Sequence, residues 1–201
     1  AAINNRRKYL DMYEAAVRDL ITAGEITTLA DEGDNVKKAA WTLFDAFTYA
    51  AIPSLTRIIE GSLGAYYNGL VDDSLDMTQP YDMSLVILEA IRINPPVFGV
   101  PRINAETGSR HMPLVGLSGY DPGVFGEDAR EYRVRFDFTG YQETLLNWAD
   151  AALPNGLPLS TNHVCPAKSF SFNTILSFLL ALDPTQWTRA QVDGFVLTKN
   201  N

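Results

Sequence analysis

Apolar residues recur at helical spacing over the first third of the chain. One such stripe between residues 6 and 23 predicts an amphipathic helix, with Gly24 at its C-terminal end. The stripe consists of Tyr9, Met12, Tyr13, Ala16, Val17 and Leu20. A more apolar helix is predicted from Val36 to Ile52, and Pro53 is expected to kink or end it. Residues 55–70 are expected to form a further helix.

The rest of the chain predicts two helices, a few short strands and a long irregular segment. Asp82 or Ser84 is expected to cap a helix that runs to Ile93, where Asn-Pro-Pro stops it. Short apolar runs broken by Gly and Pro predict a small sheet over 97–118, and 120–164 shows no sustained period. The apolar run 170–180 predicts the last helix, and 194–198 a strand. The fold class is therefore mainly α with a small β region.

Length and charge limit the kinds of molecule that this chain is expected to bind. The 201 residues suit one domain, and a net charge of −8 without a basic stripe argues against nucleic acid as a partner. No apolar run reaches the roughly 20 residues that span a bilayer, so no transmembrane segment is expected. Residues 1–8 have no apolar signal-peptide region and no initiator Met, which suggests a processed or partial product.

Cys165 is the only cysteine, so it cannot form a disulfide within the chain. It is either an inert small hydrophobe or a functional thiolate. Pro166 suits the first turn of a helix, which puts Cys165 at the predicted N-cap. A thiolate is stabilised there by free N–H groups, and it could bind a soft metal or a haem iron.

Glu89 and Arg92 would share one face of a helix at i, i+3 spacing. An isolated pair of this kind is usually solvated. Because the predicted helix is apolar on both sides of the pair, burial is the alternative, and further partners would then be required. The segment Tyr120–Phe125 and Arg135, ten residues beyond it, are candidates for these partners.

The order of these motifs resembles the C-terminal half of the cytochrome P-450 (haem-thiolate) superfamily. The E-x-x-R pair, the Asp-Pro-x-x-Phe turn, the Arg-Phe dipeptide and the Asn-x-x-Cys loop follow one another in the family's order. Residues 92–97 and 162–168 are similar to the branch containing allene oxide synthases and fatty-acid hydroperoxide lyases. The resemblance implies one partial domain, with helices over 1–96, strands and a meander over 97–164, and a ligand helix and tail over 165–201.

The resemblance also implies roles for the matched residues. Cys165 would be the axial ligand of a haem b iron. Glu89, Arg92 and Arg135 would form a buried triad that holds the ligand loop.

Three further residues would belong to the cofactor-binding set. Arg102 would pair with a haem propionate. His163 stands where the family usually has Lys or Arg, and it would contact a propionate only when protonated. Lys168 completes the ligand-loop pattern.

The candidate catalytic residues are Thr48 and Asn162. Residues 36–52 match the family's central helix over the haem, but Phe47-Thr48 replaces the Phe-Asn of the hydroperoxide branch. Ala167 and Val134 replace a glycine after the cysteine and a proline before the meander arginine. The N-terminal half of the superfamily fold is missing, so a second polypeptide or a larger complex is expected to supply it.

Three functions remain open. The first is a haem-thiolate enzyme that rearranges a fatty-acid hydroperoxide without external reductant, because the peroxide brings its own oxidising equivalent. The second is a catalytically degenerate P-450-like structural subunit in a larger assembly. The third is an unrelated α+β domain whose motifs match by chance.

Several polar residues have simpler explanations. His111 is expected in a loop and not at a metal, and Asp72, Asp73 and Asp76 in a solvated loop, because their spacing is not that of an EF-hand. Ser160-Thr161 is expected to form a turn.

Overall fold

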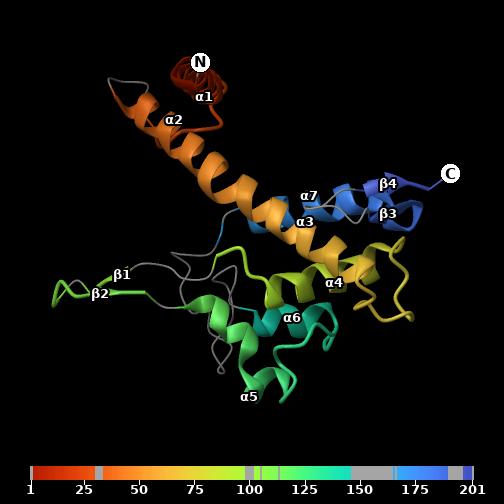
Figure 1. Ribbon diagram of the computed structural model, residues 1–201. Coiled ribbons are helices and arrows are strands. Elements are labelled where there is room, and N and C mark those ends of the chain that lie inside the picture. Colours follow the sequence, from red (N-terminus) through yellow and green to blue (C-terminus); the bar gives the residue numbers. More distant parts are fainter. Residues whose placement is uncertain are drawn as a thin grey trace. The chain divides into compact units, whose positions relative to one another are not determined.

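The computed structural model describes residues 2–29, 34–97, 102–104, 106–112, 114–145, 165, 167–189 and 197–200. The chain divides into two compact units, Ala1–Pro53 and Ser54–Asn201. Within the described ranges, helices predominate and the strands form two small antiparallel pairs (Figure 1). The prediction of a mainly α fold with a small β region is confirmed at this level.

The first unit is built on two helices, α1 (Ala2–Thr22) and α2 (Asn35–Asp45). Val17 of α1 is buried, and Tyr13 meets Phe44 of α2 edge-on, with ring centroids 6.3 Å apart. The predicted apolar stripe is only partly covered, because Tyr9 and Met12 are 53% and 58% exposed. Packing against one neighbouring helix buries a narrower face than the stripe provides.

The helix that Pro53 is expected to kink or end does not end there. A π-helical segment, Ala46–Ala51, follows α2 directly, and α3 (Ile52–Tyr67) follows that segment. Pro53 is the second residue of α3. The change in hydrogen-bond pattern therefore comes just before the residue that cannot donate a backbone hydrogen bond.

Helix α4 (Pro80–Ile93) is the buried helix of the second unit, and its described side chains from Met83 to Arg92 are all buried. It begins earlier than predicted, with Gln79 at the N-cap in place of Asp82 or Ser84. Both predicted caps are otherwise engaged: the Asp82 carboxylate accepts from the amide of Asp76, and the Ser84 hydroxyl donates to the Pro80 carbonyl. Pro80 at the first helical position supplies the start instead.

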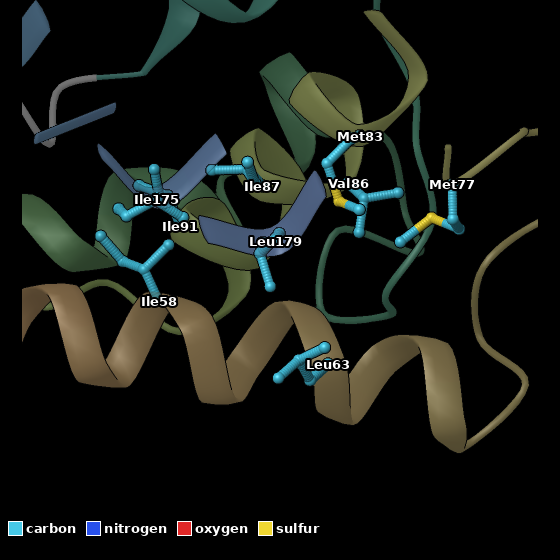
Figure 2. Packing of buried hydrophobic residues seen from close by; sticks show 9 residues of the cluster. All are labelled: Ile58, Leu63, Met77, Met83, Val86, Ile87, Ile91, Ile175 and Leu179. Atoms are coloured by element: carbon cyan, nitrogen blue, oxygen red, sulfur yellow. The ribbon is translucent and has the colours of Figure 1, made fainter. Parts of the chain in front are cut away.

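Helices α3, α4 and α7 (Lys168–Leu182) enclose the main apolar core (Figure 2). The core consists of Ile58, Leu63, Met77, Met83, Val86, Ile87, Ile91, Ile175 and Leu179. A second cluster lies on the other side of α4, against residues 121–145, which are called the meander below. It consists of Leu85, Leu88, Phe125, Ala129, Tyr141 and Leu145. Because α4 contributes to both clusters, it is buried all round.

The remaining elements are short. Strands β1 (Arg102–Ile103) and β2 (Arg110–His111) form a hairpin where a small sheet is predicted, and β3 (Trp187–Arg189) pairs with β4 (Leu197–Lys199). Four short helices complete the second unit: η2 (Val115–Tyr120), α5 (Pro122–Phe125), α6 (Phe138–Thr144) and η3 (Pro184–Gln186). The expectation of a wholly irregular segment from 120 onward is wrong at α5 and α6. Asp121 and Asp137 cap these two helices by accepting from Gly123 and Gly140.

The packing of α7 on α4 gives a stability prediction. Leu179 is fully buried in the main core, whereas Phe170 on the same helix is 64% exposed. We expect Leu179→Ala to lower the free energy of unfolding by about 2–5 kcal/mol through lost contacts and a residual cavity. The control Phe170→Ala should cost less than about 1 kcal/mol. Urea unfolding followed by tryptophan fluorescence measures both, and equal losses would contradict this account of the core.

Candidate functional site

The candidate site is centred on a fully buried ion pair in the last turns of α4. The Arg92 guanidinium donates from Nε to Glu89 Oε2 at 2.8 Å and from Nη2 to Glu89 Oε1 at 2.5 Å. Both side chains are 0% exposed. The pair is therefore buried and bidentate, and the solvated alternative is wrong.

Every N–H of the guanidinium has an acceptor. Besides the two bonds to Glu89, Nη1 donates to the carbonyls of Gly119, at 2.5 Å, and Ala129, and Nη2 donates to the carbonyl of Glu131 at 2.8 Å. These carbonyls come from η2 and the meander, 27 to 39 residues along the chain. One buried side chain thus holds an irregular segment against α4.

The carboxylate is equally saturated. Glu89 Oε1 also accepts from the backbone N–H of Arg133 at 2.9 Å, and Oε2 also accepts from the Tyr141 hydroxyl at 2.6 Å. Both oxygens therefore accept two hydrogen bonds. This removes the usual objection to burying a charge pair, which is that lone pairs and protons go unpaired.

The Tyr120–Phe125 segment contacts the pair as well. The guanidinium carbon of Arg92 lies over the Phe125 ring, 4.9 Å from the ring centroid. The Tyr120 hydroxyl donates to the Ile93 carbonyl at 2.5 Å. At Gly119 the backbone passes so close to α4 that an added Cβ would lie 2.5 Å from the Arg92 carbonyl oxygen. Only glycine fits this approach without displacing the segment.

Arg135 joins the network by a different route from the predicted triad. Its Nη2 donates to the carbonyls of Asp128 at 2.5 Å and Glu131 at 3.1 Å, and its Nη1 pairs with the Asp128 carboxylate at 3.2 Å. Its backbone N–H donates to the Tyr141 hydroxyl at 3.1 Å. Arg135 therefore meets the Glu89–Arg92 pair through Tyr141 and the shared Glu131 carbonyl, and its buried Nε has no acceptor among the described residues.

Two tyrosines pack around this network. Burial raises the pKa of Tyr141. The Glu89 carboxylate raises that pKa further, because it repels the phenolate form and accepts a hydrogen bond from the neutral hydroxyl. Burial and Glu89 also raise the pKa of Tyr132, whose hydroxyl donates to the Val86 carbonyl at 3.0 Å. Both phenols therefore stay neutral donors throughout the physiological pH range.

Cys165 is half-buried and lies just before α7, but not at its N-cap. The N-cap is Ala167, the helix begins at Lys168, and the amide of Lys168 donates to the Cys165 carbonyl at 3.2 Å. The prediction that Cys165 caps the helix is wrong by two residues, because this turn precedes the first α-helical bond, from Ser171 to Ala167. The thiol still lies on the approach to the positive end of α7.

Lys168 lines a cavity of about 150 Å³ between α4, α6 and the start of α7. The walls are Leu88, Phe138, Tyr141, Leu145, Lys168, Ser169, Phe172 and Asn173. The cavity is therefore lined both by Tyr141 of the Glu89 network and by the first residues of α7, which follow Cys165 in the chain.

The other predicted site residues are not gathered at this network. Thr48 is half-buried in the π-helical segment of the first unit. Arg102 begins β1 opposite His111, which lies in β2 and not in a loop as predicted. Asn162, His163 and Ser160-Thr161 lie outside the described residues. No group of three His, Cys, Asp or Glu able to hold a metal ion occurs in the described part of the chain.

The acidic loop is solvated as predicted. Asp72 and Asp76 are exposed and accept hydrogen bonds from Ser74 and Thr78. These bonds lower the pKa of each aspartate. Turn chemistry therefore accounts for this group.

Two residues of the network were not predicted from the sequence. Tyr141 sits in a segment with no helical period, but Asp137 four residues earlier is an N-cap signal that could have located α6. Gly119 precedes the Tyr-Asp-Pro turn, and a glycine there is a sign of close backbone approach.

In comparisons with known proteins, no family model matches this chain and no curated protein is significantly similar to it. Of the helices in the described ranges, none is both long and apolar enough to cross a bilayer, in agreement with the absence of a transmembrane segment from the sequence prediction.

The buried pair predicts a large cost for removing one charge. Glu89→Gln should lower the free energy of unfolding by about 3–5 kcal/mol, because Arg92 would remain buried without a counter-charge. The control is Arg133→Gln, which removes a 72% exposed side chain paired with Asp128 but keeps the amide that bonds Glu89. Its cost should stay below about 1 kcal/mol in the same urea titration. Similar costs for the two variants would refute the role given to burial.

The close approach at Gly119 predicts opposite effects for two Gly→Ala substitutions. Gly119→Ala should destabilise by about 1–3 kcal/mol through overpacking against the Arg92 carbonyl. Gly64→Ala, within α3 and with no atom within 4 Å of the added Cβ, should stabilise by about 0.5–1 kcal/mol. Thermal melts of both variants give the sign directly, and a neutral Gly119→Ala would disprove the constraint.

Proposed function

We propose that this chain is the cysteine-ligand half of a haem-thiolate protein of the cytochrome P-450 type, similar to allene oxide synthases and hydroperoxide lyases. Its cofactor is haem b, bound through the Cys165 thiolate. Its substrate is a fatty-acid hydroperoxide, and a second polypeptide or a larger complex completes the substrate side. No external reductant takes part.

The observation that carries the proposal is the saturated network around Glu89 and Arg92. The family resemblance implies a buried set of Glu89, Arg92 and Arg135 in this part of the chain. Here the pair gathers the carbonyls of Gly119, Ala129 and Glu131, and it is linked to Arg135. The E-x-x-R pair, Phe125 of the Asp-Pro-x-x-Phe turn and Arg135 all reach one buried cluster, and this supports the resemblance over a chance match of motifs.

The donor set around Cys165 is compatible with haem ligation. A thiolate-ligated haem needs one protein sulfur, and Cys165 offers a half-buried thiol on the approach to a 15-residue helix. When bound, such a haem supplies cleavage of the O–O bond of a peroxide, assisted by electron donation from the thiolate. The chain's own part is to hold the thiol in place, through α7 and the packed network behind it.

A structural subunit is the second candidate, and one observation favours it. The network is complete within the chain, because the Arg92 donors and Glu89 oxygens all pair with protein groups. It would persist without a cofactor. Thr48 in place of the branch's asparagine points the same way, so retention of the fold and retention of the activity are separate questions.

Visible spectroscopy decides between these candidates. Purified protein reconstituted with haem should show a strongly red-shifted Soret band when it is reduced under carbon monoxide. Cys165→Ser should abolish that band, because the thiolate is its cause. A normally folded protein that takes up no haem would overturn the haem-thiolate proposal in favour of the structural subunit.

If the band is present, hydroperoxide turnover separates enzyme from scaffold. Loss of the ultraviolet absorbance of a conjugated fatty-acid hydroperoxide, with no reductant added, supports catalysis. The test includes Thr48→Val, which removes a hydroxyl and keeps the side chain's shape. Turnover that is unchanged in Thr48→Val would exclude Thr48 as a catalytic residue.

A further inference from the structure

Tyr141 joins two features that the sequence treats separately, the Glu89–Arg92 pair and the start of α7. Its hydroxyl donates to Glu89 Oε2 at 2.6 Å and accepts from the amide of Arg135 at 3.1 Å. The side chain is 0% exposed, and its ring meets Phe136 edge-on at 5.5 Å. The hydroxyl therefore acts both as a donor and as an acceptor, and these two bonds together with the ring contact fix the orientation of the side chain.

The same residue faces the beginning of α7. Tyr141 lines the cavity whose opposite wall includes Lys168 and Ser169, the first residues of α7. Helix α6, which carries Tyr141, also contacts α7 directly, because the rings of Phe138 and Phe172 meet edge-on at 5.8 Å. Movement of Tyr141 would thus change the packing beside the turn that holds Cys165.

Tyr132 provides a natural comparison. Its hydroxyl also donates to an α4 acceptor, the Val86 carbonyl, and its side chain is half-buried. It packs against the main core and does not line the cavity at the start of α7. Both phenols thus donate one hydrogen bond to α4, Tyr141 to a carboxylate and Tyr132 to a main-chain carbonyl, but only Tyr141 lines the cavity at the start of α7.

We infer that Tyr141 is a positioning residue that transmits the fixed geometry of Glu89 to the Cys165 turn. The hydroxyl holds α6 on α4, and α6 in turn holds the first turn of α7. The contacts from Glu89 through Tyr141 and α6 to α7 do not require a cofactor. Only the role of these contacts in positioning an iron ligand rests on the proposed function. Loss of the hydroxyl removes one of the two hydrogen bonds to Glu89 Oε2 and leaves the Arg135 amide without its acceptor, so the hydrogen bond that joins Tyr141 of α6 to α4 is lost.

The lone cysteine makes the inference measurable without any cofactor. Cys165 is the only thiol in the chain, so alkylation by iodoacetamide reports on this turn alone. Tyr141→Phe should raise the alkylation rate in native buffer about threefold to tenfold, because a hydrogen bond to a charged group is lost. Tyr132→Phe, the matched control, should leave the rate within about twofold of the starting protein, since its lost bond does not reach α7.

Urea unfolding of both variants separates local from global effects. Tyr141→Phe is expected to lose more stability than Tyr132→Phe, because its lost bond is to a carboxylate, and only Tyr141→Phe should be alkylated faster than the starting protein in native buffer. Equal alkylation rates in the two variants would overturn the inference, because Tyr141 would then act only through general stability.

Phe138→Leu tests the contact between α6 and α7, and it replaces Tyr141→Phe as the test if that variant fails to fold. It weakens the α6–α7 ring contact and keeps the Tyr141 hydroxyl, so alkylation of Cys165 should rise while the pair stays intact. An unchanged rate would show that α6 does not hold the turn. Since none of these readouts needs haem, failure here is distinct from failure of the haem-thiolate proposal.

Discussion

Burial of the charged Glu89–Arg92 pair is the constraint on which the second unit depends. Two charges removed from water must be paired and fully hydrogen-bonded, or the structure loses several kcal/mol. Glu89 alone cannot satisfy Arg92, so the remaining donors need acceptors from elsewhere. Main-chain carbonyls of Gly119, Ala129 and Glu131 supply them, and this fixes a segment that has little regular structure of its own.

Such a network determines which structure forms more than it increases stability. A buried ion pair often contributes little beyond apolar residues of the same volume, whereas removing one partner is costly. The meander therefore has one position in which every donor of Arg92 and both oxygens of Glu89 are paired, and displaced positions leave these charged groups without partners. The apolar clusters on the two sides of α4 provide the stability, and the pair between them fixes the register of the meander.

The sequence predicts the helices and the burial of the pair better than it predicts the connections. Periodicity located the helices because their apolar faces are long, and the apolar flanks of Glu89 and Arg92 indicated burial. Of the two effects expected of Pro53, an end of the helix is wrong, because a π-helical segment before it leads into α3. Tyr141 and Gly119 were missed because their importance arises from contacts 52 and 27 residues away, which no local pattern encodes.

The Glu89–Arg92 network supports the fold but does not by itself indicate catalysis. Glu89, Arg92 and their partners form a closed set, so their geometry is equally useful to a haem carrier and to a structural subunit. What would distinguish these functions is the role of the half-buried Cys165 thiol, which precedes α7 near the cavity that Tyr141 and Lys168 line. If the position of Cys165 responds to the Tyr141 hydroxyl, the network serves the thiol as well as the fold, and ligation becomes the more economical explanation of both.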